Sequence, residues 1–214
     1  MKRLWGLCAV LLAGGCSQVS MESFTDPDFR EATYRRVMVA AVFPDLDRRR
    51  AAEAAFVRAM AESDAEAEAS LEYLLPTRQY SDDEVREILL RHNFDAVLTV
   101  RRTERWQEEE HVPGPGPYYY RPYGTLGADI FYYRGGFGFY EPYPYDRGYT
   151  VTETHLRHEI NLYDVASKRM AWIATSHATI DDPSDLKSLY KALAMEAVER
   201  LIETGLVPLA VAAE

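Results

Sequence analysis

Cysteine is nearly absent from this chain. The 214 residues contain two, Cys8 and Cys16, and both lie within the first sixteen positions. The sequence after Cys16 therefore has no cysteine with which to form a disulfide bridge, a thiolate metal site or a nucleophile. A domain built from it must be held together by its hydrophobic core alone, even in an oxidising compartment.

Long apolar runs and basic charge are also lacking. After Cys16, no apolar stretch approaches the roughly 18 residues that a membrane-spanning helix requires. The formal net charge is −10. A surface this acidic repels nucleic-acid phosphates and anionic lipid headgroups, so we expect neither as a bulk partner, and its main effect is to keep the domain in solution.

The motifs of common enzyme classes are missing as well. No Gly-x-Ser-x-Gly elbow is present, and Gly135 to Gly138 lacks the Lys-Ser/Thr pair of a phosphate-binding loop. Glu108 to His111 reads as a solvated charged run. On one strand, His155 and His158 point to opposite faces and cannot chelate one metal ion, although a composite site with His177 on a neighbouring strand is conceivable. We therefore expect a non-enzyme with no catalytic, metal or cofactor-binding residues.

The N-terminal segment carries the strongest signal. A basic region at Lys2 and Arg3 precedes an apolar run, residues 4–12, that is too short for a permanent membrane span. Residues 12–16 (LAGGC) resemble the lipobox of bacterial lipoproteins. That resemblance implies cleavage before Cys16 and a covalent lipid on it, with palmitate among its acyl chains. The alternative is an ordinary secretory signal in which Cys16 is incidental.

This resemblance also implies a location. Each buried acyl methylene contributes roughly 0.8 kcal/mol, so two or more chains hold a protein stably on a membrane. Ser17 after the lipidated cysteine favours the outer membrane, by resemblance to lipoprotein sorting. We expect a lipid-anchored protein of the bacterial cell envelope that faces the periplasm. Cleavage would leave 199 residues, which is long enough for one domain with a hydrophobic core. With Lys2 and Arg3 lost, the net charge would be −12.

The remaining sequence predicts an α/β (α+β) fold. Apolar or alternating runs predict strands at residues 35–43, 69–75, 95–106, 150–165 (with one register shift) and 169–180. Amphipathic stretches predict helices at 48–63, from the capping box Ser81–Glu84 onward, and from Asp182 to about Thr204. Asp45 or Asp47 caps the first helix and Gly205 ends the last. This order describes a single mixed sheet of about five strands packed by about three helices.

A Tyr/Gly/Pro-rich insert interrupts this pattern at residues 113–148. With Tyr149 it contains ten of the fifteen tyrosines, eight of the twelve glycines and six of the eleven prolines. Pro and Gly disfavour regular structure, so we expect a long loop that is either a contact surface or a low-complexity segment. The candidate contact residues are Tyr118, Tyr119, Tyr120, Tyr123, Tyr132, Tyr133, Tyr140, Tyr143 and Tyr145.

These observations divide the chain into six segments. They are a signal peptide (1–15), the lipidated cysteine and tether (16–33), two parts of the α/β domain (34–112 and 149–207), the insert (113–148) and a tail (208–214).

Several stretches resemble a set of bacterial lipoproteins of uncharacterised function. They are Asp26 to Phe29 (DPDF), residues 36–41, 49–56 and 94–98, and the late strands from His158 to Trp172. More distantly, the layout is similar to the curli-secretion lipoprotein and to penicillin-binding-protein activator lipoproteins, which implies work in envelope assembly.

We therefore expect a non-enzymatic binding or envelope-assembly module. Its partners would be the membrane, through the lipid on Cys16, and an envelope protein or glycan that contacts the tyrosines. The alternative is an oligomeric secretion or pore accessory subunit, and a hydrolase is the third possibility.

Overall fold

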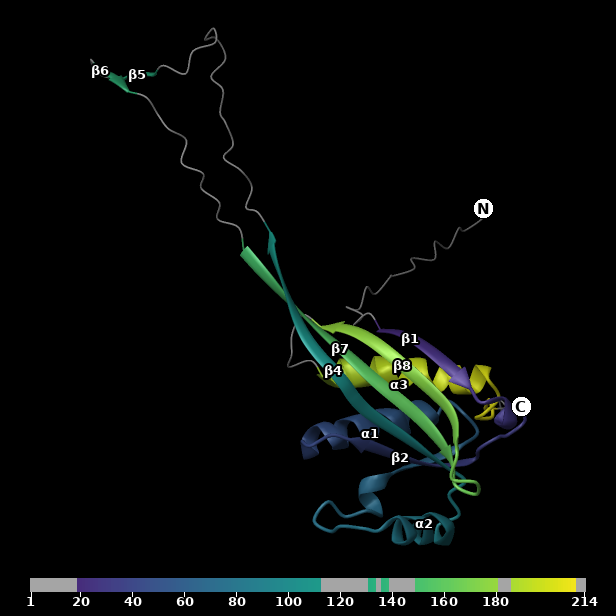
Figure 1. The fold of residues 1–214 in the computed structure, drawn as a ribbon. Coiled ribbons are helices and arrows are strands. Elements are labelled where there is room, and N and C mark those ends of the chain that lie inside the picture. The colour runs from purple at the N-terminus through teal and green to yellow at the C-terminus, as the bar shows by residue number, and fades with distance from the viewer. Residues whose placement is uncertain (1–18, 113–130, 134–135, 139–148, 181–185, 211–214) are drawn as a thin grey trace, which may run out of the picture. The chain divides into compact units, whose positions relative to one another are not determined.

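The computed structural model describes residues 19–112, 131–133, 136–138, 149–180 and 186–210 (Figure 1). The chain divides into two compact units: unit 1 comprises Met1–Trp106 and Thr154–Glu214, and unit 2 comprises Gln107–Glu153. The elements are β1 (Val19–Thr25), η1 (Pro27–Phe29), β2 (Arg36–Val42), α1 (Leu46–Met60), β3 (Glu66–Ala69), η2 (Ser70–Glu72), α2 (Asp82–Arg91), β4 (Ala96–Val112), β5 (Phe131–Tyr133), β6 (Gly136–Gly138), β7 (Tyr149–Asp164), β8 (Met170–Ile180) and α3 (Leu186–Glu203).

One open mixed sheet forms the framework, with strand order β1-β8-β7-β4-β2-β3. Strand β2 runs parallel to β3 and β4, whereas β8 runs antiparallel to β1 and β7. The hairpin of β7 and β8 shifts register between Leu162 and Tyr163, and its turn contains Lys168 at a φ of 62°. The predicted fold class is confirmed, with six strands in this sheet instead of about five.

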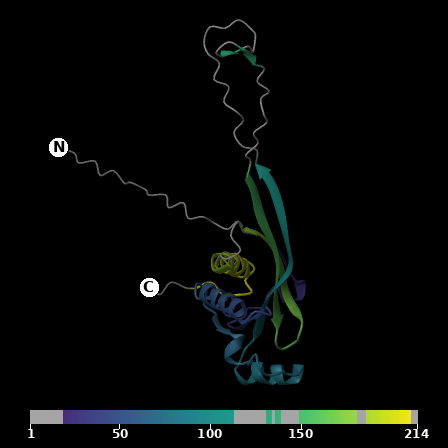
Figure 2. The same ribbon diagram turned by 90° about the vertical axis from the view of Figure 1, so that its left-hand side faces the viewer.

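Helices α1 and α3 lie side by side over one face of the sheet (Figure 2). Of the two predicted cap candidates, Asp45 and Asp47, it is Asp45 that caps α1, because its carboxylate accepts a hydrogen bond of 2.8 Å from the Arg48 N–H. Gly205, at a φ of 76°, follows the end of α3 in the left-handed conformation that glycine adopts at low cost. No helix in the described part of the chain has both the length and the apolar character to span a bilayer.

The main core lies between these two helices and the sheet. Its largest side chains are fully buried: Phe56 of α1, Leu162 of β7, Trp172 of β8 and Leu193 of α3. Side chains this large each contribute a few kcal/mol by leaving water, so this layer is the main source of stability.

Helix α2 covers only a corner of the opposite face. Its capping box is present as predicted, since Ser81 accepts a hydrogen bond from the Glu84 N–H and Glu84 accepts one from the Ser81 N–H. Leu89 and Phe94 pack with Met38 and Val165 in a separate small cluster. Over β1, β8 and the adjoining part of β7, no described helix lies on this face (Figure 2).

The sequence predicts an irregular tether over residues 16–33, but the structure instead contains a strand there. Strand β1 pairs with β8 along its whole length, from Val19 opposite Ala178 to Thr25 opposite Trp172. Only Val19 and Met21 direct apolar side chains toward the core. Two apolar positions among polar ones are too few for an alternation pattern to be recognised.

Two further expectations need correction. The second strand, expected at residues 69–75, lies earlier as β3, because Tyr73 and Leu74 instead pack against the cluster under α2. The insert, expected as a loop, contains the short antiparallel pair of β5 and β6 in unit 2. Phe131 to Tyr133 are aromatic residues, which favour strands.

A buried carboxylate joins three elements of unit 1. Glu53 of α1 is 1% exposed. Its Oε1 accepts hydrogen bonds from the Ala41 N–H (3.1 Å), Arg49 Nε (3.0 Å) and Ser70 Oγ (2.7 Å), and its Oε2 accepts one from the Leu71 N–H (3.2 Å). The buried charge of Glu53 is therefore compensated by four hydrogen bonds, and these bonds connect β2, α1 and η2.

Replacing Glu53 by alanine should be strongly destabilising, because Arg49, Ser70 and two backbone N–H groups lose their acceptor. We expect Glu53→Ala to lower the free energy of unfolding by about 3–5 kcal/mol, measured by urea titration. The exposed Glu62, just after the same helix, is the control, and Glu62→Ala should cost about 0.5 kcal/mol or less. Equal effects of the two substitutions would contradict this role for Glu53.

Candidate functional site

The two faces of the β7–β8 hairpin differ in chemistry. Its register places His155 opposite Thr179 and Arg157 opposite His177 on the face turned away from α1 and α3, which we call the outer face. His158 and Ser176 are opposite each other on the inner face and are buried. The prediction that His155 and His158 point to opposite faces is therefore confirmed.

The outer face contains a hollow of about 160 Å³. We call it the outer-face hollow and define it by its lining residues, which come from β1, β4, β7 and β8: Ser20, Trp106, His155, His177, Ala178 and Thr179. A cavity of roughly 150 Å³ can hold a benzene molecule. The outer-face hollow thus has room for one ring-sized group.

A stacked aromatic pair forms one wall of this hollow. The rings of Trp106 and His155 lie 5.1 Å apart, with 13° between their planes. Nδ1 of His155 is 3.1 Å from Oγ1 of Thr179, within hydrogen-bond distance. Because Trp106 is 41% exposed, part of its ring remains available to a ligand, beside hydroxyl and imidazole groups that can donate or accept hydrogen bonds.

Two pairs of opposite charges lie on strands that form the outer face. Arg101 donates hydrogen bonds of 2.8 and 2.7 Å to the two carboxylate oxygens of Glu159, and Asn161 donates one of 2.7 Å. Hydrogen bonding from Arg101, and then from Asn161, holds the pKa of Glu159 below its usual value, and Glu159 raises the pKa of Arg101. Arg157 forms an ion pair of 3.0 Å with Glu104. Since these charges are paired, the hollow favours a neutral ligand.

The structure brings His155 and His177 to the same hollow, as the composite-site alternative required. In the part of the chain that the structure describes, however, no three His, Cys, Asp or Glu side chains are grouped to hold a metal ion. The Thr179 hydroxyl and His155 imidazole also have the spacing of a nucleophile and its base. Strand β8 is paired on both sides at Ala178, so the sheet uses the backbone N–H groups that an oxyanion site would need there.

His158 lies in an apolar environment on the inner face. It is 1% exposed and makes edge-on ring contacts with Phe43 and Tyr190, each at 6.4 Å between centroids. Nδ1 of His158 and Oγ of Ser176 have no hydrogen-bond partner among the described residues. Burial, followed by the charge of Arg102, lowers the pKa of His158 to about 4.

The other candidates are placed only in part. Cys16 and most of the candidate tyrosines lie outside the described residues, and only the backbone of Tyr132 and Tyr133 is described, in β5. Glu108, Glu109 and His111 are exposed on β4, in agreement with a solvated charged run.

Sequence reasoning missed Ser20, Trp106 and Thr179. They join the hollow through strand pairing between distant parts of the chain, and local patterns contain no signal of that pairing.

Comparisons with known proteins show distant similarity of structure only. No protein-family model matches the sequence, and a search of curated proteins gives no match. Three solved structures are among those similar to this chain. The PelC dodecamer from Paraburkholderia phytofirmans is 14% identical with a TM-score of 0.47, covering 86% of this chain and 97% of that one. Lipoprotein GNA1162 from Neisseria meningitidis is 12% identical with a TM-score of 0.39, covering 77% of this chain and 99% of that one. A PDZ domain protein from Parabacteroides distasonis is 8% identical with a TM-score of 0.38, covering 85% of this chain and 35% of that one.

Similarity of this degree says nothing of function. One of the three similar structures is a lipoprotein. The finer resemblance to curli-secretion and penicillin-binding-protein activator lipoproteins stays a prediction.

Acid should destabilise the fold through His158. Its pKa is about 4 in the folded protein and about 6.5 in an unfolded chain. Between these values the unfolded chain binds more protons, so stability falls as the pH falls through 6.5 and the loss is complete below 4. We expect His158 to account for a loss of about 3 kcal/mol between pH 7 and pH 4.

Urea unfolding across this pH range measures the loss, and His158→Leu should remove that component of it. The exposed His177 is the control for replacing a histidine by leucine, and His177→Leu, which keeps His158, should retain the loss of stability that His158 causes. An identical pH dependence in wild type and His158→Leu would show that His158 is not the titrating group.

Proposed function

We propose that this protein is a lipid-anchored module of the bacterial cell envelope that binds a hydroxyl-rich glycan, without converting it, in the outer-face hollow. The main support is the lining of that hollow, where the stacked rings of Trp106 and His155 stand beside the hydroxyl of Thr179. A sugar ring has an apolar face that stacks on aromatic rings and hydroxyl groups that pair with such side chains.

The charge distribution supports the same ligand class. Two guanidinium and two carboxylate groups around the outer face are engaged in the Arg101–Glu159 and Arg157–Glu104 pairs. A charged ligand would have to break these pairs or remain uncompensated, whereas a neutral sugar would meet neither cost. Ring-sized space, an aromatic wall and paired charges therefore favour a neutral glycan over an ionic ligand or a charged peptide.

Tryptophan fluorescence offers a direct test of glycan binding. In residues 16–214 the tryptophans are Trp106 and the buried Trp172, so a change on binding reports mainly on Trp106. We expect N-acetylglucosamine tetrasaccharide or cellotetraose to alter the emission. In calorimetric titration, Trp106→Ala should weaken binding about tenfold, equivalent to roughly 1.4 kcal/mol.

Phe24 provides a matched control for Trp106. It is 62% exposed on β1 and does not line the hollow, so Phe24→Ala should leave the affinity unchanged. The proposal fails if neither saccharide binds, or if Trp106→Ala binds as well as wild type does.

The anchor makes a separate prediction. Cys16→Ala removes the proposed acceptor of the lipid, and the described chain has no helix able to replace it as a span. We expect the variant to remain an uncleaved precursor or to lose its stable attachment, as measured by membrane fractionation with a carbonate wash. Undiminished attachment that only detergent can release would overturn the lipoprotein proposal without affecting the glycan site.

A further inference from the structure

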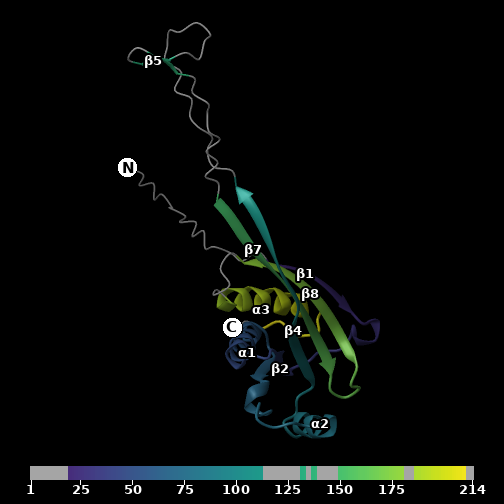
Figure 3. The same ribbon diagram turned by 60° about the vertical axis from the view of Figure 1, so that its left-hand side comes forward.

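Residues of α1 and α3 line a second concave surface. The two helices lie on the side of the sheet away from the outer face (Figure 3). This groove has a volume of about 530 Å³. Ala55 and Ala59 of α1 contribute its small apolar side chains, and Met195 of α3 is 47% exposed beside them. The charged lining residues are Arg58, Lys187, Lys191 and one acid, Glu62. We call this surface the helix groove.

The three cations of the helix groove lack compensation. Lys187 and Lys191 are exposed, and neither forms an ion pair or hydrogen bond with a described residue. The Arg58 guanidinium donates a hydrogen bond of 3.0 Å to the Ala54 carbonyl of its own helix. Like charges four positions apart repel one another. Lysine near the start of a helix also opposes the helix dipole, and the first turn of α3 holds no acid.

This arrangement lowers the stability of the isolated protein, which is otherwise rich in acids, with 34 Asp and Glu against 24 Lys and Arg. Residues that lower the stability of the fold at one place on its surface often mark a functional site. An anionic partner would remove the repulsion between the three cations.

The described chain begins near one end of this groove. Three residue steps separate Cys16 from Val19, the first residue of β1, and three residues span at most about 10 Å, so a lipid on Cys16 would be attached close to a paired strand. Val19 and Leu186, the first residue of α3, pack against the same cluster of Leu156, Ala178, Ile180 and Leu189. The first described residue of the chain, Val19, therefore lies beside the start of α3, where Lys187 follows.

We propose that the helix groove docks on the anionic phospholipid headgroups of the bilayer that holds the Cys16 lipid. This inference rests on the proposed anchor. A protein of net charge −12 held against an anionic membrane is repelled unless its basic surface faces the lipid, and each basic side chain near such a surface adds attraction. The attraction acts within about 8 Å at physiological salt, a range that the short link to Cys16 allows. In this orientation the outer face is turned away from the membrane.

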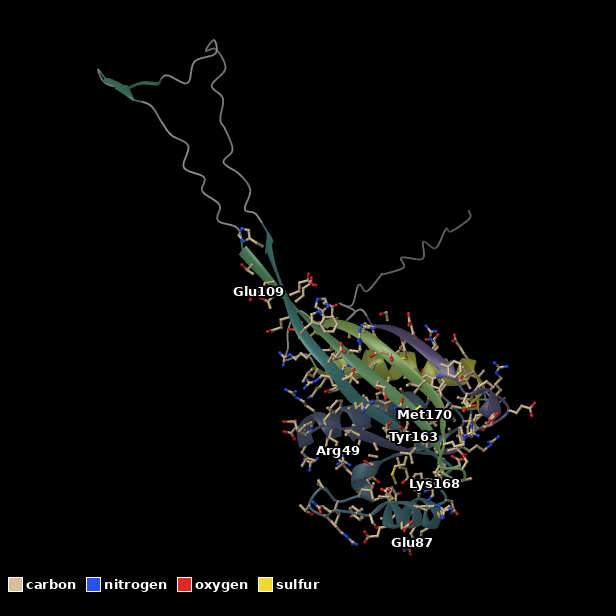
Figure 4. All side chains as sticks on the ribbon, in the orientation of Figure 1. Arg49, Glu87, Glu109, Tyr163, Lys168 and Met170 are labelled. Carbon is tan, nitrogen blue, oxygen red and sulfur yellow. The ribbon has the colours of Figure 1, made fainter. Side chains whose placement is uncertain are left out.

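Lysine acetylation can measure the orientation directly. Residues 16–214 contain three lysines, Lys168, Lys187 and Lys191. Lys168 lies in the β7–β8 turn, away from α3 (Figure 4), and is exposed. It therefore serves as an internal control in every sample.

The experiment couples Cys16 of the 16–214 chain to a maleimide phospholipid in vesicles. One set contains equal parts of phosphatidylglycerol and phosphatidylcholine, and the other contains phosphatidylcholine alone. Mass spectrometry follows acetylation of each lysine. On the anionic vesicles we expect Lys187 and Lys191 to react about threefold more slowly, Lys168 to be unchanged, and the protection to disappear at high salt.

A matched pair of charge reversals tests the groove itself. Arg58→Glu retains all three lysines and should abolish their differential protection, whereas Arg86→Glu, the same change on α2, should not. The proposal would be overturned if Lys187 and Lys191 were acetylated at the same rate on the anionic vesicles as on phosphatidylcholine alone. So would protection that appears without vesicles and rises with protein concentration, since a second copy would then cover the groove.

The chemical coupling makes the result independent of whether cells lipidate Cys16. Loss of membrane attachment in cells therefore tests the proposed anchor, and the protection of Lys187 and Lys191 from acetylation separately tests the helix groove.

Discussion

Burial of one sheet face beneath α1 and α3 is the constraint on which the rest of unit 1 depends. Phe56, Leu162 and Trp172 are fully buried in that layer, and their removal from water supplies most of the stabilising free energy. Because both helices occupy the same face, the opposite face of β1, β8 and β7 keeps half-exposed polar side chains. The two surfaces that concern function, the outer-face hollow and the helix groove, both result from this one-sided packing.

The chemistry of the two surfaces differs for electrostatic reasons. On the outer face, cross-strand partners such as Arg101 and Glu159 neutralise each other, so stacking and neutral hydrogen bonding remain as the means of recognition. In the helix groove, the three cations Arg58, Lys187 and Lys191 stand beside a single lining acid, Glu62. A neutral glycan on one surface and anionic headgroups on the other are thus compatible proposals for a single domain.

Strand β1 connects these proposals to a location in the envelope. Since pairing with β8 begins at Val19, the link to Cys16 is short, and the anchor would hold the domain near the lipid rather than suspend it on a long tether. The pairing of Thr154 with Ile180 lies at this same end of the sheet.

Features that depend on neighbours within about ten residues could be predicted from the sequence. They are the cap of α1, narrowed to Asp45 or Asp47, the cap Ser81 of α2, Gly205 after the last helix, and the alternation along β7 that separates His155 from His158. Periodicity was enough to establish the mixed α/β class. Three features could not be predicted in this way: the stacking of Trp106 on His155, the hydrogen bonds from Ser70 and Leu71 to Glu53, and the start of a paired strand at Val19. Each of these depends on which strand lies beside which and in what register, and that is set by burial summed over the whole sheet, which no local pattern contains.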